Sequence, residues 1–528
     1  MREFDQPGRS VVYSSNGMVA SSQTLASSSA LNILRSGGNA IDAAISAAAL
    51  LAVIEPTDTS IGGDCFVLYS PKGKSPPLAF NGSGKSPSKL TLQYMLENGF
   101  KEMPHQGPHT VTTPGAIDAW WQIHQRFGKL DFEEILLPAI NHAENGYVVH
   151  ERLAHHWNSN FDRLDNLGDA KSIFLNNGIP PSAGQKMKNP ALAQTLKKIA
   201  KKGRKGFYEG EIAETIVAFL NEIGGLHSLD DFYNTSGEFV EPISAEYKNN
   251  NVYQLPPNTQ GIIALIILKI LNNLNIDKHE HNSAERTHLL IEASRIAYNY
   301  RNLLLGDFNS SEKIINILND DKLIFDFSQN IKLGSIINPL PPIPKYGSNT
   351  IYLSVVDKDQ NMVSFINSIF EPFGSGLVPT NTGTLLQNRG HSFSLDKDHP
   401  NCIASSKRPM HTIIPAMVGN DNKINLTFGV MGGDYQPMGH SHVLSSIIDH
   451  NFNIQEALDA PRFLPIDNHV DFESSFPNDI IKTLSSWGHE IRQSPYPLGG
   501  GQGILIDWET GTLSGGSDPR KDGCAIGY

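Results

Sequence analysis

The residue with the clearest chemical potential is a threonine that directly follows a proline-rich segment. Residues 332–348 contain four prolines and two glycines without a periodic apolar pattern, which indicates a loop or linker. If the bond between Asn349 and Thr350 broke, Thr350 would carry a hydroxyl and a free α-amine, and the amine could be the hydroxyl's own general base. An unperturbed α-amine has a pKa of about 7.7–8.0, which suits this role near neutral pH.

The same threonine also fits a purely structural interpretation. Residues 350–356 and 362–369 are rich in β-forming side chains and flank a short polar turn at 359–361, which predicts a hairpin that begins at Thr350. Threonine is common at the start of a strand, so this local pattern alone favours a structural role for it.

The rest of the chain predicts a mixture of helices and strands that would position this hairpin. Small residues on every face of the helix expected at 40–54 indicate tight packing. Helices outside and hairpin-rich sheet inside predict α/β layers, while the strand order stays undefined. The other expected helices are 24–35, 210–223, 262–274, 284–305 and 441–448, and the other expected strands are 65–69, 427–431 and 503–507.

Composition argues against several classes of partner. The chain has 528 residues and a formal net charge of -12, so nucleic acid and anionic membrane surfaces would repel it. Its most apolar stretch, residues 43–54, is too short to span a bilayer, and its first residues lack a signal-peptide pattern. Three scattered cysteines fit a reducing compartment. We therefore expect a cytoplasmic protein.

Several motifs suggest functions that their context does not support. GKS triplets at 73–75 and 84–86 lack the earlier glycine of a phosphate-binding loop. The glycine-rich residues 499–503 precede a predicted strand, which favours close packing over dinucleotide binding. The triplets 279–281 (HEH) and 440–442 (HSH) have no third ligand at a suitable spacing, so no metal site is predicted. The absence of a GxSxG motif leaves an α/β-hydrolase without a nucleophile.

Many short segments, spread from about residue 10 to residue 528, occur in the order found in one known family. Before the hairpin they are Gly17-Met-Val-Ala-Ser-Ser, Gly37-Gly-Asn-Ala-Ile-Asp-Ala-Ala, Gly62-Gly-Asp, Thr113-Pro-Gly, Phe207-Tyr-Glu-Gly, Leu255-Pro-Pro, Ile291-Glu-Ala and Leu305-Gly-Asp. From the hairpin onward they are Thr350, Ser354-Val-Val-Asp-Lys-Asp, Phe373-Gly-Ser-Gly, Lys407-Arg-Pro, Gly432-Gly, Ala460-Pro-Arg-Phe and Ser517-Asp-Pro-Arg-Lys-Asp-Gly. On these segments the chain resembles the γ-glutamyltranspeptidase family.

The resemblance implies an α+β fold, the four-layer αββα sandwich of N-terminal-nucleophile hydrolases. It also implies autocleavage into a large subunit, residues 1–349, and a small catalytic subunit, residues 350–528, which stay together as one compact unit. The processed heterodimer could itself dimerise. No cofactor is implied, because a covalent acyl-enzyme divides hydrolysis into two easier steps.

The family's catalytic positions are present. By resemblance, Thr350 is the nucleophile that attacks the Asn349 carbonyl during maturation and the substrate amide afterwards. Ser368 matches a second hydroxyl residue close to it. Gly432 and Gly433 match the pair whose backbone N–H groups form the oxyanion hole, where each donor contributes about 2.7–4 kcal/mol to lowering the barrier. Their alternative role is a simple turn at a strand end.

The substrate-binding positions depart from those of transpeptidases that act on glutathione. The arginine that binds the glutamyl α-carboxylate is replaced by Ser83, with Lys85 nearby, and the asparagine that helps bind that group is replaced by Phe370. The acidic residue that pairs with the ammonium is missing, while Arg389 and Arg408 add positive charge. The substituted positions are Ser83, Phe370, Arg389, Ser392, His411 and Thr412.

These departures predict the substrate class. A site with an arginine and no carboxylate suits a small anionic amide better than a zwitterionic γ-glutamyl group, which is similar to the oxamate-amidohydrolase-like branch of the family. The sequence therefore predicts a self-processing amidohydrolase or acyl transferase that cleaves a small-molecule amide. The alternatives are a glutathione hydrolase/γ-glutamyltransferase proper and a catalytically silent binding scaffold. Whether water or an amine accepts the acyl group stays open.

Overall fold

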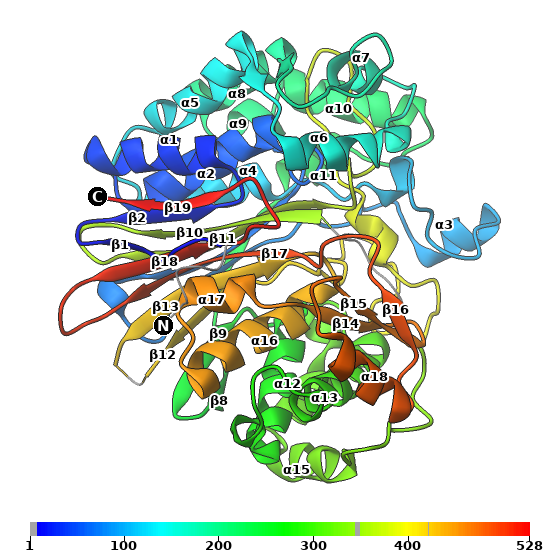
Figure 1. Cartoon of the computed structure of the whole chain (residues 1–528). Helices are drawn as coiled ribbons and strands as arrows, with labels where there is room; N and C mark the ends of the chain where they lie inside the picture. Colours follow the sequence, from blue (N-terminus) through cyan, green and yellow to red (C-terminus); the bar gives the residue numbers. More distant parts are fainter. Residues whose placement is uncertain (1–7, 344–348, 421) are drawn as a thin grey trace.

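Two antiparallel seven-stranded sheets lie face to face in the computed structural model, which describes residues 8–343, 349–420 and 422–528 (Figure 1). Sheet I consists, in order, of β19 (Cys524–Gly527), β2 (Met18–Ser21), β10 (Asn349–Val356), β11 (Met362–Phe370), β3 (Asp64–Ser70), β4 (Leu78–Gly82) and β7 (Glu238–Val240). Sheet II consists, in order, of β1 (Val12–Ser14), β18 (Leu513–Ser517), β17 (Gly500–Ile506), β13 (Ile424–Met431), β12 (Ala416–Gly419), β9 (Asn250–Gln254) and β8 (Ile243–Tyr247).

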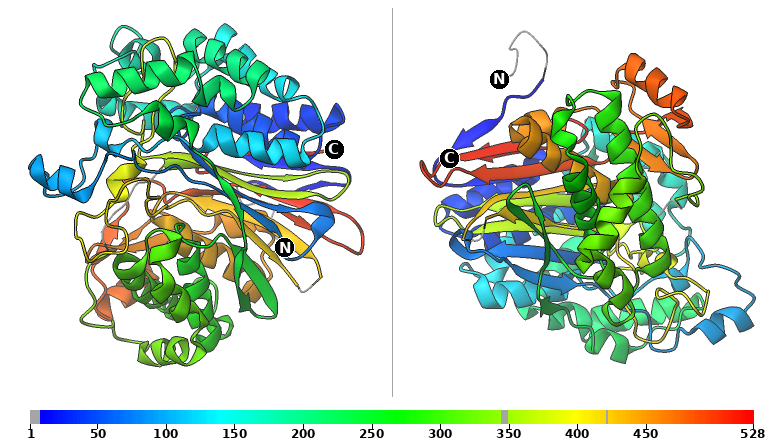
Figure 2. Two further views of the ribbon diagram at one scale, coloured as in Figure 1. Left: turned by 180° about the vertical axis from the view of Figure 1, so that it is seen from behind. Right: turned by 90° about the horizontal axis from the view of Figure 1, so that it is seen from below.

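Helices cover the outer face of each sheet, which completes the predicted four-layer αββα sandwich (Figures 1 and 2). On the side of sheet I lie α1 (Thr24–Arg35), α2 (Ala40–Ile54), α4 (Ala116–Phe127), α5 (Phe132–Asn145), α6 (Glu151–Asn158), α7 (Ala170–Phe174), α8 (Pro190–Lys202), α9 (Lys205–Tyr208), α10 (Glu211–Glu222) and α11 (Leu229–Tyr233). On the side of sheet II lie α12 (Gly261–Leu274), α13 (Ala284–Leu304), α14 (Glu312–Asn319), α15 (Asp321–Asn330), α16 (Tyr435–His450) and α17 (Ile454–Asp459).

Smaller elements decorate the sides of the sandwich. The short helix α3 (Leu92–Glu97) projects from one side in Figure 1. A three-stranded sheet of β14 (Phe463–Ile466), β15 (His469–Phe472) and β16 (Ile491–Gln493) lies with α18 (Asn478–Ser486) beside the sheet II helices, and β5 (Tyr147–Val148) pairs with β6 (Lys186–Met187).

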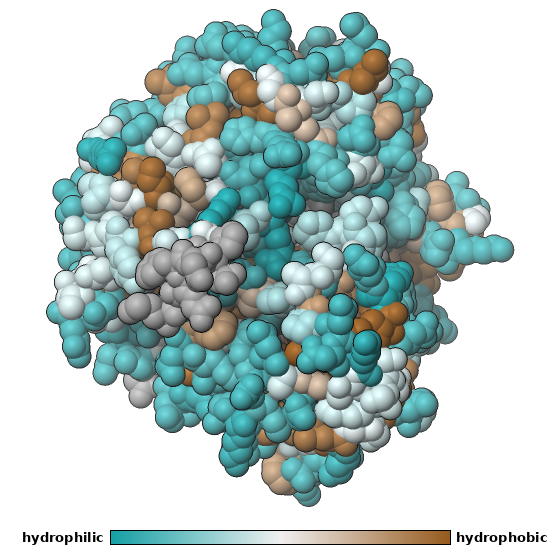
Figure 3. Space-filling model, in the orientation of Figure 1, coloured by the Kyte–Doolittle hydropathy of each residue, from teal (hydrophilic) through white to brown (hydrophobic). Residues whose placement is uncertain are grey.

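The surface shown in Figure 3 is largely hydrophilic, with hydrophobic residues in small scattered groups. Among the described residues, no helix is long and apolar enough to cross a membrane.

The elements expected from the sequence are confirmed, with two corrections. The helix expected at 441–448 begins earlier, at Tyr435, and Pro437 lies in its first turn, where proline is tolerated. Residues 500–503 lie inside β17 and not before it. A Cβ atom on Gly503 would lie 2.7 Å from Ile454 Cδ1, so this glycine allows α17 to pack closely against the strand. The close-packing interpretation of these glycines therefore holds.

The hairpin of β10 and β11 lies at the centre of sheet I and is held from both faces. Every residue of α2 is buried, and this helix packs against α1, α5 and β10. On the other face, Tyr352 and Ile366 of the hairpin join Ile504 of β17 in the core between the sheets. The turn after β10 also contacts α2 directly, since Asp357 Oδ2 accepts a hydrogen bond from Ala40 N at 2.9 Å.

Strands from before and after residue 349 interleave in both sheets. In sheet I, β10 and β11 lie between β2 and β3, while β19 pairs with the other edge of β2. In sheet II, β18, β17, β13 and β12 lie between β1 and β9. A chain break between residues 349 and 350 would therefore leave two pieces joined by backbone hydrogen bonds in both sheets.

The packing around α2 leads to a stability prediction. Ala48 is fully buried, so Ala48→Leu should overpack the layer between α2 and its neighbours and lower the free energy of unfolding by about 1–3 kcal/mol. The matched control is Gln194→Leu at an exposed position of α8, where a change within about 0.5 kcal/mol is expected. Thermal denaturation followed by circular dichroism compares the two. Equal midpoints would show that the Ala-rich helix is not tightly packed.

Candidate active site

Thr350 lies at the start of β10, and its side chain is only 1% exposed. Its Oγ1 donates a hydrogen bond to Ser368 Oγ on β11 at 3.3 Å. The pairing register of these strands shifts between Asn349 and Ile351, which is a β-bulge next to the threonine. Bulges change the direction of a side chain and are common beside active sites. The residues before Asn349 that were expected to lead into the cleavage site, Gly347 and Ser348, lie outside the described part of the chain.

Arg389 approaches the same serine from a different segment. It begins the 3₁₀ helix η6 (Arg389–Ser392), and its Nη2 donates to Ser368 Oγ at 3.3 Å. Its Nη1 donates to Thr412 Oγ1 at 3.0 Å, and its guanidinium carbon lies 4.1 Å from the centroid of the Phe370 ring. Phe370 ends β11 with φ +84, a value that is unfavourable for a bulky residue. Thr350 and Arg389 therefore contact the same hydroxyl.

The Arg389 guanidinium lies in a buried environment that disfavours its positive charge. Its side chain is fully buried, and this burial lowers its pKa to about 9, although Asp64 and Glu371 act in the opposite direction. Within the described residues, no carboxylate lies at ion-pair distance from it, and its Nε has no hydrogen-bond partner. A buried cation in this state is stabilised by any anionic group that binds beside it.

His411 and Asp64 form a fixed pair near this arginine. His411 Nε2 lies 3.0 Å from Asp64 Oδ2, and burial followed by the charge of Arg389 lowers the histidine's pKa to about 3. The imidazole is therefore neutral at pH 7, with its proton on Nε2. The other oxygen of Asp64, Oδ1, accepts from Gly84 N, Gly115 N and the Gln387 side chain at 2.9–3.0 Å.

Asp64 was not among the predicted site residues, although the segment Gly62-Gly-Asp belongs to the motifs quoted above. Its two oxygens accept four hydrogen bonds from protein donors. The expectation of a site without any nearby carboxylate is therefore corrected: Asp64 and Glu371 both act electrostatically on Arg389, and Asp64 is fully engaged by protein donors.

The other predicted substrate-binding positions either contact the residues of the site or are paired elsewhere. Ser83 belongs with the site, because its Oγ accepts from Asn258 Nδ2 at 3.0 Å and Asn258 O accepts from His411 N. Ser392 Oγ donates to the carbonyls of Met410, at 2.9 Å, and of Arg389, at 3.0 Å, so it lies beside the arginine's backbone. Arg408 adds no uncompensated charge, contrary to expectation, because it forms an ion pair with Glu238.

Gly432 and Gly433 connect β13 to α16. Their φ angles are +111 and +55, values that favour glycine, and a Cβ on Gly432 would lie 2.6 Å from Gly499 Cα. Gln260 Nε2 donates to the Gly433 carbonyl at 2.9 Å and to the Thr412 carbonyl at 2.7 Å. This glutamine therefore joins the glycine pair to the residue that contacts Arg389.

A second set of buried side chains holds the loop that contains Gly432 and Gly433. Arg301 Nη1 donates to Gln260 Oε1 at 3.0 Å and to Asp434 Oδ1 at 2.6 Å, and the Tyr298 hydroxyl donates to the Asp434 carbonyl. Both Arg301 and Tyr298 come from α13, whose helical pattern was recognised without any indication of this role. In the sequence, the family segment Leu255-Pro-Pro just before Gln260 was the feature that could have drawn attention to this residue.

The described residues therefore place the predicted nucleophile, the second hydroxyl, the arginine and the glycine pair on one continuous hydrogen-bonded path. It runs from Thr350 through Ser368, Arg389, Thr412 and Gln260 to Gly433. Such an arrangement offers a hydroxyl nucleophile, a binding cation and a glycine turn suited to stabilising an oxyanion.

Comparison with known proteins agrees with this geometry. The family model described as gamma-glutamyltranspeptidase matches residues 26–528. The glutathione hydrolase-like YwrD proenzyme of Bacillus subtilis (strain 168) is 35% identical over 519 residues, which cover 97% of this chain and 98% of the relative. The oxamate amidohydrolase proenzyme of Klebsiella pneumoniae is 31% identical over 530 residues, which cover 98% of this chain and 99% of the relative.

A solved structure is similar over the same length. The crystal structure of cephalosporin acylase from Bacillus halodurans matches with a TM-score of 0.93 and 38% identity, covering 100% of this chain and 99% of that one. The relatives from Bacillus subtilis and Klebsiella pneumoniae are both named as proenzymes, which supports a precursor that is cleaved into two subunits. The chain therefore belongs to the γ-glutamyltranspeptidase family and is a self-processing amidohydrolase of the N-terminal-nucleophile type.

Proposed function

We propose that cleavage between Asn349 and Thr350 produces an enzyme that uses Thr350 as nucleophile and general base and acts on small anionic amides. The observation that carries this proposal is the contact of Thr350 Oγ1 and Arg389 Nη2 with the same Ser368 hydroxyl. A hydroxyl and a buried cation without an ion-pair partner among the described residues thus both contact one serine hydroxyl.

Maturation follows from the chemistry of an N-terminal nucleophile. The Thr350 hydroxyl attacks the carbonyl carbon of Asn349, the C–N bond to Thr350 breaks, and an ester forms on the threonine oxygen. Water hydrolyses this ester, which leaves a carboxylate on Asn349 and a free α-amine on Thr350. Interleaving of the strands in both sheets keeps the two subunits together.

Turnover uses the new amine. It takes the hydroxyl proton as the Thr350 oxygen attacks the substrate amide, and the oxyanion that forms is stabilised by the N–H groups of Gly432 and Gly433. The amine then returns the proton to the leaving nitrogen, and an acyl-enzyme remains. Water, activated by the same amine, releases the acid and restores the hydroxyl.

Substrate choice is proposed to depend on Arg389. A substrate carboxylate would provide the buried guanidinium with the charge partner that the described residues do not supply. Neutral His411 adds no competing charge, and Ser83 cannot replace an arginine as a carboxylate ligand. The Klebsiella pneumoniae relative is named for oxamate, a small amide with one carboxylate.

A glutathione hydrolase would in addition have to bind the substrate ammonium. Two carboxylates act electrostatically on Arg389, but Asp64 is engaged by its own donors, and Glu371 Oε2 accepts from Arg163 Nη2 at 2.7 Å and Asn388 Nδ2 at 2.6 Å. The engagement of both oxygens of Asp64 favours a substrate without an ammonium group, whereas Glu371 keeps Oε1 directed toward His105 and would have to be the ammonium's partner in a glutathione hydrolase. A silent scaffold is disfavoured because Thr350 and both glycines are intact.

Two expectations from the sequence, the cellular location and the oligomeric state, stay proposals. Cytoplasmic location would be tested by cell fractionation, and dimerisation of the processed heterodimer by light scattering on the purified enzyme. Whether water or an amine accepts the acyl group would be decided by turnover with and without added amine.

The first prediction from the proposed function concerns the bond that is cut. The purified protein should separate into fragments of residues 1–349 and 350–528 under denaturing conditions and run as one particle otherwise. Thr350→Ala should leave one uncut chain, and Thr350→Ser should cut slowly, since a hydroxyl remains. Ser354→Ala removes another buried hydroxyl of β10 and should be cut normally. N-terminal sequencing of the small fragment decides, and any first residue other than Thr350 contradicts the mechanism.

The second prediction concerns the glycine pair. Gly433→Val should lower turnover per processed molecule by about 10²–10³-fold, because a β-branched residue cannot easily adopt φ +55 and the displaced N–H is a transition-state donor. Gly511→Val, at φ +73 in an open turn, introduces comparable strain away from the site. Steady-state kinetics on folded, processed protein measures both. Near-normal turnover of Gly433→Val would place the oxyanion hole elsewhere.

The third prediction concerns the substrate. Oxamate should have a kcat/KM higher than glutathione by about two to four powers of ten, since glutathione's ammonium and carboxylate each lose a charge-assisted partner worth about 1.5–3 kcal/mol. Arg389→Ala should abolish this preference, whereas Lys85→Ala, which removes an exposed cation, should retain it. If glutathione were the better substrate by a wide margin, the glutathione-hydrolase alternative would replace this proposal.

A further inference from the structure

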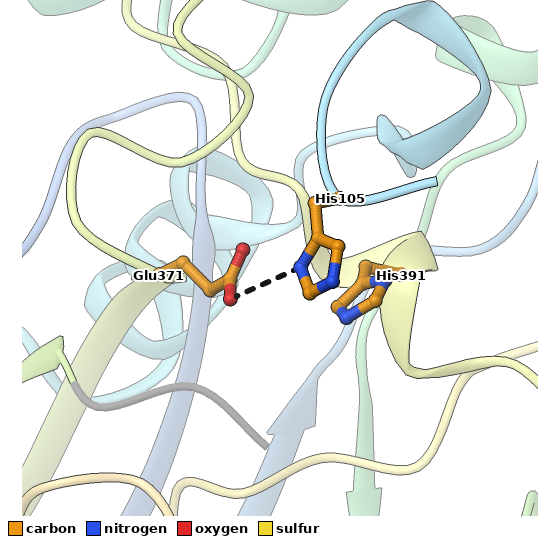
Figure 4. A group of neighbouring side chains, drawn as sticks. All are labelled: His105, Glu371 and His391. Atoms are coloured by element: carbon orange, nitrogen blue, oxygen red, sulfur yellow. Dashed lines mark ion pairs between the residues drawn. The ribbon is translucent and has the colours of Figure 1, made fainter. Parts of the chain in front are cut away.

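Three potential metal ligands converge beside the catalytic residues, from three separate segments of the chain. His105 precedes η2 (Pro108–Thr110), Glu371 directly follows β11, and His391 lies in η6. One ligand atom from each of these side chains lies within 4.8 Å of the other two. Figure 4 shows the Glu371 carboxylate directed toward the His105 ring, with the His391 ring beside it.

The separation of these atoms suits a shared ion. His105 Nδ1 lies 3.6 Å from Glu371 Oε1, which is too long for a hydrogen bond. Two ligand atoms that are each about 2.0–2.2 Å from a tetrahedral Zn²⁺ are roughly 3.4 Å apart. The His105 ring lies against the His391 ring, with centroids 3.9 Å apart and planes 34° apart, so the exposed His105 side chain would have to rotate for all three ligands to share one coordination sphere.

His391 has the tautomer that a metal ligand requires. Its Nδ1 lies 3.1 Å from the Met103 carbonyl oxygen and 3.0 Å from the Pro104 carbonyl oxygen, so Nδ1 carries the hydrogen and Nε2 keeps its lone pair. A backbone carbonyl that fixes the tautomer in this way is a usual partner of metal-binding histidines.

Glu371 is oriented in a similar way. Its Oε2 accepts hydrogen bonds from Arg163 Nη2 and Asn388 Nδ2, at 2.7 and 2.6 Å, which directs Oε1 toward His105. The His105 side chain is 67% exposed, so a dissolved ion can reach the group. Two of the three ligands are thus held by hydrogen bonds to the protein, and the third is exposed to solvent.

A second cluster in the described residues offers the same residue types but not the same opportunity. His288 Nδ1 lies 2.7 Å from His489 Nε2, and His288 Nε2 lies 3.0 Å from the Lys332 carbonyl. Glu292 accepts two bonds from Arg295 and one from Ile337 N. An ion would have to break these contacts, so this buried cluster is a structural hydrogen-bond network.

One histidine of each triplet seen in the sequence is engaged in a similar way. His440 Nε2 accepts from Val430 N at 3.1 Å, and its Nδ1 lies 3.2 Å from Gln254 Nε2. His281 Nε2 lies 2.8 Å from Ser446 Oγ. Neither triplet contributes to the clusters found among the described residues.

We propose that His105, Glu371 and His391 form a binding site for a divalent transition-metal ion, with Zn²⁺ as the expected occupant. Two imidazoles and one carboxylate are a ligand set that Zn²⁺ favours, and they leave a fourth position for water or a ligand anion. The site lies at the rim of the catalytic residues, because Glu371 follows Phe370 and His391 shares η6 with Arg389. An ion here adds positive charge next to the proposed carboxylate-binding arginine.

The test is calorimetric titration of Zn²⁺ into chelator-treated, purified protein, repeated with Co²⁺ while its visible absorption is recorded. One ion per chain should bind, and the Co²⁺ spectrum should show the intense bands of a four-coordinate site. His105→Ala, Glu371→Gln and His391→Ala should each weaken binding at least tenfold, while His279→Ala should bind like the original protein.

Uncut Thr350→Ala should bind Zn²⁺ as well as the processed enzyme does, because the ligands do not depend on the threonine. This variant separates the metal proposal from the catalytic one, since either can fail alone. His105→Ala changes an exposed residue and should fold normally, which guards against variants that lose binding by unfolding. Failure of the original protein to bind saturably, or equal binding by His105→Ala and Glu371→Gln, would overturn the proposal.

Discussion

The pairing of β10 with β11 is the constraint on which the candidate site depends. Because side chains alternate between the faces of a strand, a slip of one residue would move every side chain of the hairpin to the opposite face. The observed register, with its bulge at the start of β10, brings Thr350 to Ser368 and places Asp64 of β3 opposite Ser368. The buried helix α2 on one face and sheet II on the other leave no room for such a slip.

The second constraint is electrostatic. Arg389 is buried against an aromatic ring, and its nearest acidic neighbours are held by other donors. Desolvation of this cation costs free energy that the described residues only partly recover, and Phe370 beneath it has an unfavourable backbone conformation. Uncompensated charge and backbone strain tend to persist where function requires them. Their coincidence beside Thr350 agrees with a site that is completed by an anionic ligand.

Local patterns were sufficient to predict much of the fold. Helices α1 and α2 begin and end as expected, since Gly37-Gly38 and Asn39 separate them clearly, and the hairpin of β10 and β11 follows from two β-forming runs around a polar turn. The order of strands was not predictable. It depends on pairings between distant segments, such as β19 with β2, that leave no local signal.

The same distinction applies to the site. Thr350, Ser368, Arg389, Thr412 and the two glycines were identified by resemblance to known sequences, and the structure joins them through Gln260, which this comparison did not single out. Gln260 reaches across 173 positions to Gly433, and Arg408 is neutralised by Glu238, 170 positions away. Partners this distant can be identified only when the chain is folded, which explains why the charge of Arg408 was misjudged.

One arginine can serve both the base and the substrate in the proposed mechanism. A free α-amine on Thr350 would lie close to the positive charge of Arg389, which contacts the same serine. A nearby like charge disfavours protonation of the amine and lowers its pKa, so more of the empty enzyme would hold the amine in its basic form near neutral pH. A bound substrate carboxylate would neutralise the guanidinium and raise the amine's proton affinity again. The amine would therefore become a stronger base only when a substrate of the correct charge is in place.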